Sequence, residues 1–184
     1  MTTTLRPKYI SFDCYGTLIN FQMKEKMEEL FADRVSPENM KQFTTDFARY
    51  RLDEVMGDFR PYDEILCNSV ERTCRRWGVE YREDEGLKFY EAVKTWQPHP
   101  DVPAALAKLA TEYRLVILSN SMNDLIPHSV EKLGAPFHRV YTAQQAGAYK
   151  PRLQAFEYMI EQLGCSPDDI LHVSSSYRYD HLSA

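Results

Sequence analysis

The sequence predicts an α/β protein in which a parallel sheet carries helices on both faces and is interrupted near its start by an all-helical segment. A short apolar strand stands directly before Asp13. Residues from about 20 to 98 show helical patterns and no convincing strand. From Val102 onward, amphipathic helices alternate with continuous apolar strands, which is typical of a parallel sheet covered on both sides.

The first strand ends in a carboxylate. Aromatic and β-branched residues at 9–12 favour a buried strand, and Gly16 with Thr17 ends it abruptly. Asp13 therefore lies at the carboxyl end of a strand, where open α/β sheets bind their ligands. We interpret it as a candidate nucleophile. The alternative is an aspartate that only caps the following turn.

The segment after the first strand predicts helices. Ser36 followed by Pro37 indicates an N-cap with proline at the first helical position. Three helices are expected, at about 37–57, 61–78 and 83–96, and a stiff proline-rich connection follows at 97–101.

The second half alternates between helices and strands. We expect strands at 115–118, around 140–141 and at 170–173, with helices through 105–109, up to Gly134 and over 151–164. The first strand must join this sheet across the helical segment. The core is therefore built from both ends of the chain.

Composition limits the classes of partner. The 184 residues are 43% hydrophobic and 27% charged, with a formal net charge of -5, which argues against a nucleic-acid or membrane-surface partner. No run approaches the roughly 20 apolar residues of a membrane span, and residues 1–6 lack the apolar stretch of a secretory signal, so a cytoplasmic location is expected. The four cysteines show no Cys-x-x-Cys spacing, so neither a zinc site nor a disulfide framework is predicted.

Polar residues follow each later strand as well. Ser119 and Asn120 follow one strand, Lys150 follows another, and a serine run at 174–176 with Asp180 follows the last. Because parallel strands end at one edge of a sheet, these groups are expected to converge near Asp13.

The ordered motifs Phe12-Asp13-x-Tyr15-Gly16-Thr17-Leu18, Leu118-Ser119-Asn120, Tyr149-Lys150-Pro151 and Val173-Ser174-Ser175 with Asp180 resemble the haloacid dehalogenase superfamily. Within it, they resemble the L-2-haloacid dehalogenases of type II. The resemblance implies a Rossmann-like core at 1–19 and 99–184 and a helical cap at 20–98. It also implies a further strand and helix after Ala184, so we expect the core to be incomplete at its C-terminal end.

Carboxylate positions separate the branches of that superfamily. Its phosphatases carry an acid two positions after the nucleophile and another in the last motif, because Mg²⁺ needs oxygen ligands and the leaving alcohol needs a proton donor. Here Tyr15 and Ser175 stand in those places. We therefore expect no metal and no cofactor.

The resemblance implies a reaction on a small-molecule 2-haloacid. Asp13 attacks the α-carbon opposite the halogen, and water then resolves the ester, so that an L-2-haloacid becomes a D-2-hydroxyacid. Lys150 is the expected cation that keeps Asp13 charged. The alternative is a solvated loop lysine before a proline.

Other residues are candidates for binding the substrate. Ser119 is expected to donate to the substrate carboxylate and Asn120 to face the departing halide, unless both form a simple helix cap. Tyr15 shapes the pocket or donates its hydroxyl, or else fills space beneath the cap.

The last motif implies lysine positioning and activation of water by Ser175, Ser176 and Asp180, and the serine run allows a one-residue slip in register. For halide release the family supplies a cap arginine. We favour Arg51, with Arg49 second, although either could be a solvated helix residue.

Three functions follow in order of preference. The first is a metal-free 2-haloacid hydrolase, the second a binding or assembly protein that has lost turnover, and the third a small-molecule phosphatase. The histidines form no triad or metal spacing that would support another reaction. The aromatic-rich cap also makes a homodimer an expectation.

Overall fold

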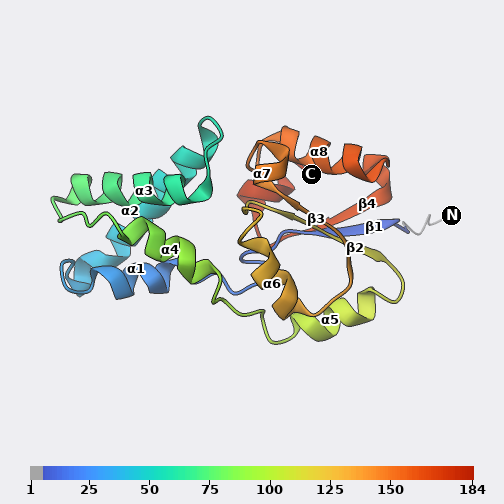
Figure 1. Ribbon diagram of the computed structural model, residues 1–184, viewed down its shortest axis with the longest axis horizontal. Helices are drawn as coiled ribbons and strands as arrows, with labels where there is room; N and C mark the ends of the chain where they lie inside the picture. The colour runs from blue at the N-terminus through green and yellow to red at the C-terminus, as the bar shows by residue number, and fades with distance from the viewer. Residues whose placement is uncertain (1–5) are drawn as a thin grey trace. The chain divides into compact units, whose positions relative to one another are not determined.

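The computed structural model describes residues 6–184, so the expectation about a secretory signal at residues 1–6 falls almost wholly outside the described part. Four strands form one sheet in the order β3-β2-β1-β4, and every pairing is parallel (Figure 1). They are β1 (Tyr9–Phe12), β2 (Arg114–Ser119), β3 (Phe137–Thr142) and β4 (Ile170–Val173). The predicted parallel sheet is confirmed.

Strand β1 lies between two partners from distant parts of the chain. All four of its residues are buried, as the aromatic and β-branched pattern predicts for a central strand. Phe12 is level with Ile117 of β2 on one side and with Val173 of β4 on the other. Asp13, the next residue, is thereby held between the ends of two neighbouring strands.

Helices cover both faces of the sheet. Figure 1 shows α7 (Ala143–Ala146) and α8 (Leu153–Leu163) on one face, and α5 (Val102–Leu109) and α6 (Ile126–Leu133) on the other. Under α8, the side chains of Phe156 and Met159 pack with those of Val116, Leu118 and Tyr141. This apolar layer fixes the strands whose ends carry the polar residues.

Helix α1 (Met23–Phe31) and three short elements, one of them the 3-10 turn Pro167–Asp169, were not expected from the sequence pattern. Helix α7 is a single turn, stabilised by a capping box in which Thr142 and Gln145 exchange side-chain and backbone hydrogen bonds. After β4, a five-residue π-helical turn spans Tyr177–His181. That turn carries Asp180, so its geometry determines where this carboxylate lies.

The chain divides into two compact units. One consists of the chain up to Phe21 together with Gln97–Ala184, and the other of Gln22–Trp96. The second unit is helical and contains α1 (Met23–Phe31), α2 (Pro37–Met56), α3 (Tyr62–Trp77) and α4 (Glu85–Val93).

The helical unit has its own aromatic core and a buried polar centre. Phe43 packs its ring against those of Phe31 and Trp77, with ring centroids 4.9 and 5.6 Å apart. Next to them, the buried carboxylate of Asp46 accepts a hydrogen bond from Trp77 Nε1 at 3.2 Å and one from Arg76 Nε at 3.3 Å. Burial alone would raise the pKa of Asp46, but these donors hold it below its ordinary value.

The described cysteines are all free thiols. Cys74 is buried, and burial raises its pKa to about 11. Cys67 lies on the same helix, against α4. Both behave as small apolar residues of the helical unit.

No helix among residues 6–184 has the length and apolar character needed to cross a membrane.

Gly86 lets α4 approach α3 at Cys67. A Cβ atom added at Gly86 would lie 2.6 Å from Cys67 Cα and 2.8 Å from its backbone nitrogen, and would also overlap Sγ. We therefore predict that Gly86→Ala lowers the free energy of unfolding by about 1–3 kcal/mol, which denaturant titration would measure.

Whether Gly86→Ala raises or lowers the free energy of unfolding tests the close approach of α4 to α3. Glycine to alanine in an exposed helix interior stabilises a protein by about 1 kcal/mol, so a gain would contradict the close approach. Because the clash involves backbone atoms of α3, Cys67→Ala should not rescue the variant.

Candidate active site

Asp13 lies in a tight turn at the carboxyl end of β1. Its backbone N–H donates to the Val173 carbonyl at 3.0 Å, which continues the sheet by one residue. Gly16 then takes a φ of 94°, a conformation that favours glycine. This turn brings the Thr17 hydroxyl back to Asp13 Oδ2, to which it donates at 2.9 Å.

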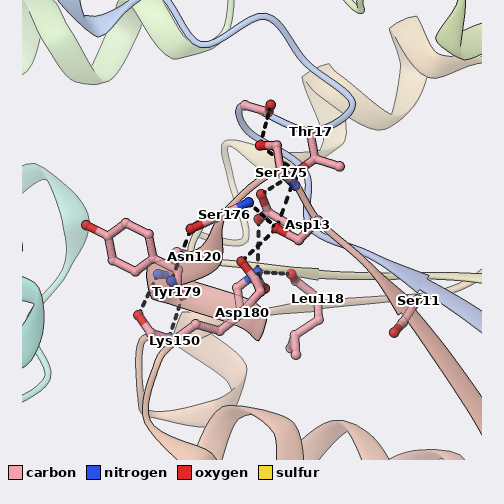
Figure 2. A network of polar contacts seen from close by, with 12 residues as sticks. Ser11, Asp13, Thr17, Leu118, Asn120, Lys150, Ser175, Ser176, Tyr179 and Asp180 are labelled. Atoms are coloured by element: carbon pink, nitrogen blue, oxygen red, sulfur yellow. Dashed lines mark hydrogen bonds and ion pairs between the residues drawn. The ribbon is translucent and has the colours of Figure 1, made fainter. Parts of the chain in front are cut away.

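The other carboxylate oxygen of Asp13 is bound by a buried lysine. Lys150 Nζ donates to Asp13 Oδ1 at 2.9 Å, to Asp180 Oδ1 at 2.6 Å and to the Leu118 carbonyl at 2.8 Å. The lysine is only 1% exposed, so its charge is balanced by the two carboxylates rather than by water. The structure thus brings together Asp13, Lys150 and Asp180, which lie far apart in the sequence (Figure 2).

Asn120 holds the backbone of that lysine. Its side-chain amide nitrogen donates to the Lys150 carbonyl at 2.9 Å, and its oxygen accepts from the Lys150 N–H at 2.7 Å. This two-way clamp joins the end of β2 to the loop before α8. One amide N–H of Asn120, the group that we expected to face the halide, is therefore already used to position Lys150.

Asp180 is fully buried and surrounded by donors. Besides Lys150, it binds His172 Nε2 through Oδ1 at 2.9 Å and accepts from the Ser174 hydroxyl through Oδ2 at 2.9 Å. Burial by itself would raise the pKa of Asp180. The hydrogen bond from His172 and the charge of Lys150 outweigh it and hold the pKa below the ordinary carboxyl value.

The three serines after β4 have different partners. Ser174 contacts Asp180, as described. Ser175 donates its backbone N–H to Thr17 Oγ1 at 2.9 Å and its hydroxyl to the Gly16 carbonyl at 2.8 Å. Ser176 caps the π-helical turn, because its hydroxyl accepts from the Tyr179 N–H at 3.0 Å. Of the two predicted serines, Ser175 is thus the one joined to the Asp13 turn.

Tyr15 and Ser119 lie beside this network. The Tyr15 hydroxyl accepts from Ser129 of α6 at 3.1 Å, so its tip is directed toward that helix. Ser119 ends β2 and is buried, and its hydroxyl has no hydrogen-bond partner among residues 6–184. A buried hydroxyl of this kind is available to a ligand.

The two candidate arginines belong to the helical unit. Arg51 Nη1 donates to the Tyr62 hydroxyl at 2.9 Å, and Arg49 Nη1 donates to Asp46 Oδ1 at 3.1 Å. These contacts describe the arginines within their own unit. A role for either in halide release stays a prediction.

Three residues of the network had no assigned role in our sequence-based interpretation: Thr17, Ser174 and His172. Thr17 and Ser174 were part of the quoted motifs only. The role of His172 could have been recognised from its strand pairing. It lies level with Ser11 of β1, and both are polar residues in otherwise apolar strands. Such a pair becomes visible only when the strand pairing is known.

The donor set does not fit a divalent metal ion. Mg²⁺ is bound by several hard oxygen ligands, commonly carboxylates. Both oxygens of Asp13 already accept from the Lys150 ammonium and the Thr17 hydroxyl, and a tyrosine stands two positions after it. Across residues 6–184, no group of three or more His, Cys, Asp and Glu side chains is arranged to hold a metal ion.

The fold and this site define an α/β protein with an aspartate paired to a buried lysine at the carboxyl edge of a parallel sheet. The model of the haloacid dehalogenase-like hydrolase family matches residues 7–184. The chain therefore belongs to that family.

The individual relatives are less than 30% identical to this chain in sequence. Haloacetate dehalogenase H-2 of Moraxella sp. (strain B) is 29% identical over 173 residues, covering 91% of this chain and 76% of that protein. The (S)-2-haloacid dehalogenase of Xanthobacter autotrophicus is 27% identical over 176 residues, covering 92% and 68%. The solved structure of the L-2-haloacid dehalogenase from Xanthobacter autotrophicus superposes with a TM-score of 0.77 at 24% identity, covering 95% of this chain and 72% of that one. This last similarity concerns the fold.

The buried lysine generates a stability prediction. Replacing Lys150 by methionine removes the cation and leaves Asp13 and Asp180 facing each other. We expect the free energy of unfolding at pH 7 to fall by about 3–5 kcal/mol, as for other buried ion pairs that lose one partner. Denaturant titration measures the change. Lys8→Met is the control, because the Lys8–Asp169 pair is exposed and its loss should leave the midpoint unchanged.

The pH dependence of the free energy of unfolding should reverse in Lys150→Met. In the native protein, the lowered pKa of Asp180 stabilises the fold above the ordinary carboxyl pKa of about 3.9, and this stabilisation is lost at lower pH. Without Lys150, repulsion from Asp13 raises the pKa of Asp180. The variant should then gain stability relative to the native protein between pH 7 and 5, and a constant difference would contradict the charge balance.

Proposed function

We propose that the protein hydrolyses L-2-haloacids to D-2-hydroxyacids through an ester on Asp13, without a metal ion. The single observation that carries the proposal is the contact between the Asp13 carboxylate and the buried Lys150 ammonium. Two relatives whose names describe the dehalogenation of haloacetate and of (S)-2-haloacids support this substrate class.

In the first step, a carboxylate oxygen of Asp13 attacks the α-carbon from the side opposite the halogen. The new carbon–oxygen bond forms as the carbon–halogen bond breaks, and the halide leaves with the bonding electron pair. The carbon is inverted, which converts the L-haloacid into the ester of a D-hydroxyacid. The step needs a carboxylate as nucleophile, and Lys150 places a positive charge within hydrogen-bond distance of it.

In the second step, water attacks the carbonyl carbon of the ester. The bond from that carbon to the hydroxyacid oxygen breaks, the hydroxyacid takes one proton of the water, and the other is released as Asp13 ionises again. Lys150 and Thr17 donate to the two carboxylate oxygens, so either is placed to stabilise the oxyanion that develops. The complete burial of Asp180 favours a positioning role for it over direct activation of water.

The substrate carboxylate needs donors of its own. The buried Ser119 hydroxyl supplies one at the end of β2. We assign halide stabilisation to Arg51, with Arg49 as the second candidate, and the function of a cap to the helical segment 20–98. Tyr15 lines the substrate pocket in this proposal.

The cellular setting follows from general properties. The free cysteines among the described residues fit a reducing compartment, and we propose a cytoplasmic enzyme acting on a small molecule.

The reaction predicts halide release that is independent of added metal. Purified protein incubated with (S)-2-chloropropionate should release chloride at the same rate with and without EDTA, as measured by a chloride electrode. Loss of activity with EDTA would favour a metal-dependent phosphatase instead. Absence of release from chloro-, bromo- and fluoroacids would favour a binding protein.

Replacement of the nucleophile gives a sharper test. Asp13→Asn keeps the shape of the side chain but removes the charge that attacks carbon, so chloride release should fall below detection while circular dichroism stays that of the native protein. Turnover at the native rate in this variant would exclude Asp13 as the nucleophile. In a single turnover of the native enzyme in H₂¹⁸O, the label should enter the Asp13 carboxylate.

A further inference from the structure

His172 is fixed at both ring nitrogens in the middle of β4. Its Nδ1 lies 2.8 Å from the Ser11 hydroxyl of β1, and its Nε2 lies 2.9 Å from Asp180 Oδ1. The ring also meets Phe156 of α8 edge to face, with centroids 5.6 Å apart. With its side chain 8% exposed, the imidazole is held in one orientation.

The partners determine the direction of these hydrogen bonds. Asp180 is ionised, so its oxygen accepts and Nε2 carries a proton. In the neutral ring Nδ1 then accepts from the Ser11 hydroxyl. A serine, a histidine and a carboxylate in sequence resemble a hydrolytic triad, but Ser11 is completely buried within β1 and cannot reach a substrate. The imidazole therefore acts on Asp180 and not on a nucleophilic serine.

His172 and Lys150 converge on the same oxygen atom. Asp180 Oδ1 accepts from Lys150 Nζ at 2.6 Å and from His172 Nε2 at 2.9 Å. The ammonium in turn is shared between Asp180 and Asp13. The hydrogen bond from His172 withdraws negative charge from Asp180 Oδ1, so Asp180 interacts less strongly with Lys150. Lys150 can then interact more strongly with Asp13.

We propose that His172 is a positioning residue that acts through Asp180 to set how Lys150 is shared between the two carboxylates, and thereby the reactivity of Asp13. The proposal deepens the proposed function and rests on it. Without the imidazole N–H, Asp180 becomes the stronger acceptor and draws Lys150 away from the nucleophile. The effect should fall on kcat, because the substrate carboxylate is bound elsewhere.

Two substitutions separate the hydrogen bond from the packing. His172→Phe keeps a flat ring beside Phe156 but removes both nitrogens, whereas His172→Gln retains an N–H at about the position of Nε2. With (S)-2-chloropropionate, we expect His172→Phe to lower kcat roughly tenfold, the effect of one lost hydrogen bond to a charged group, with KM within about twofold. His172→Gln should recover most of kcat. His138→Phe, the same change on β3 at the opposite edge of the sheet, is the control and should change neither constant.

The titration of Asp180 gives a readout that does not depend on turnover. The ionisable groups around the imidazole are Asp180, with Lys150 behind it, and Glu157 of α8, which lines the same cavity as His172. Burial raises the pKa of Asp180 and the His172 hydrogen bond lowers it. The pKa of Asp180 should therefore rise in His172→Phe and stay near the native value in His172→Gln. Carboxyl ¹³C NMR measures this directly, and the acid limb of the kcat profile should move to higher pH with it.

Chemical rescue keeps the test available if His172→Phe does not fold. A cavity of about 220 Å³, lined by Phe156, Ile160 and Ser183 among others, borders His172. Imidazole added to His172→Ala should enter it and restore part of kcat, whereas it should do nothing for His138→Ala. A purely structural histidine would show no such recovery.

The outcomes distinguish this proposal from the proposed function. An active native enzyme whose kcat is the same in all His172 variants overturns the positioning role and leaves the dehalogenase proposal standing. A native protein that releases no halide overturns the dehalogenase proposal. The NMR titration then decides the coupling alone: an unchanged Asp180 pKa in His172→Phe overturns it, and a raised one supports it.

Discussion

The structure of the site depends on one buried ammonium group. Lys150 has three N–H donors and three acceptors, of which two are carboxylates from opposite ends of the chain. Moving a charge out of water is costly, and the cost is offset only when geometry and counter-charges are nearly complete. The Asn120 clamp on its backbone, the carbonyl of Leu118 and the donors around Asp180 all contribute to that completeness.

The same arrangement explains the density of hydroxyl groups around the aspartates. Two carboxylates share one ammonium, so the cluster carries an excess negative charge when His172 is neutral. Thr17, Ser174 and His172 each donate to a carboxylate oxygen and spread that charge. A lysine that belongs to the chain also differs from a bound metal ion, because it is present in every molecule and needs no exchangeable partner.

The sequence predicts those parts of the fold that depend on local pattern. Apolar runs bounded by glycine and proline give the strands and long helices, and the parallel sheet with helices on both faces follows from their alternation. The single-turn helix α7 and the π-helical turn are too short to show a period. At the site, Asp13 directly follows β1, whereas Lys150 lies in the loop before α8 and Asp180 lies on the π-helical turn after β4. The order of polar residues after the strands predicts that the three meet at one edge of the sheet, but not the contacts between them. The sequence could not show which of Ser174, Ser175 and Ser176 contacts which partner, because three identical residues in a row can be aligned with the motif in more than one way. His172 was set aside because its partner Ser11 is 161 residues away.

The central place of β1 in the sheet has a consequence for biosynthesis. Its two neighbours, β2 and β4, follow it by 105 and 161 residues. While a ribosome translates the helical segment, this apolar strand has no partner to pair with, and the helical segment can fold first as a compact unit of its own. Tyr9–Phe12 thus cannot pair with a neighbouring strand of the native sheet until residues 114–117 have been synthesised.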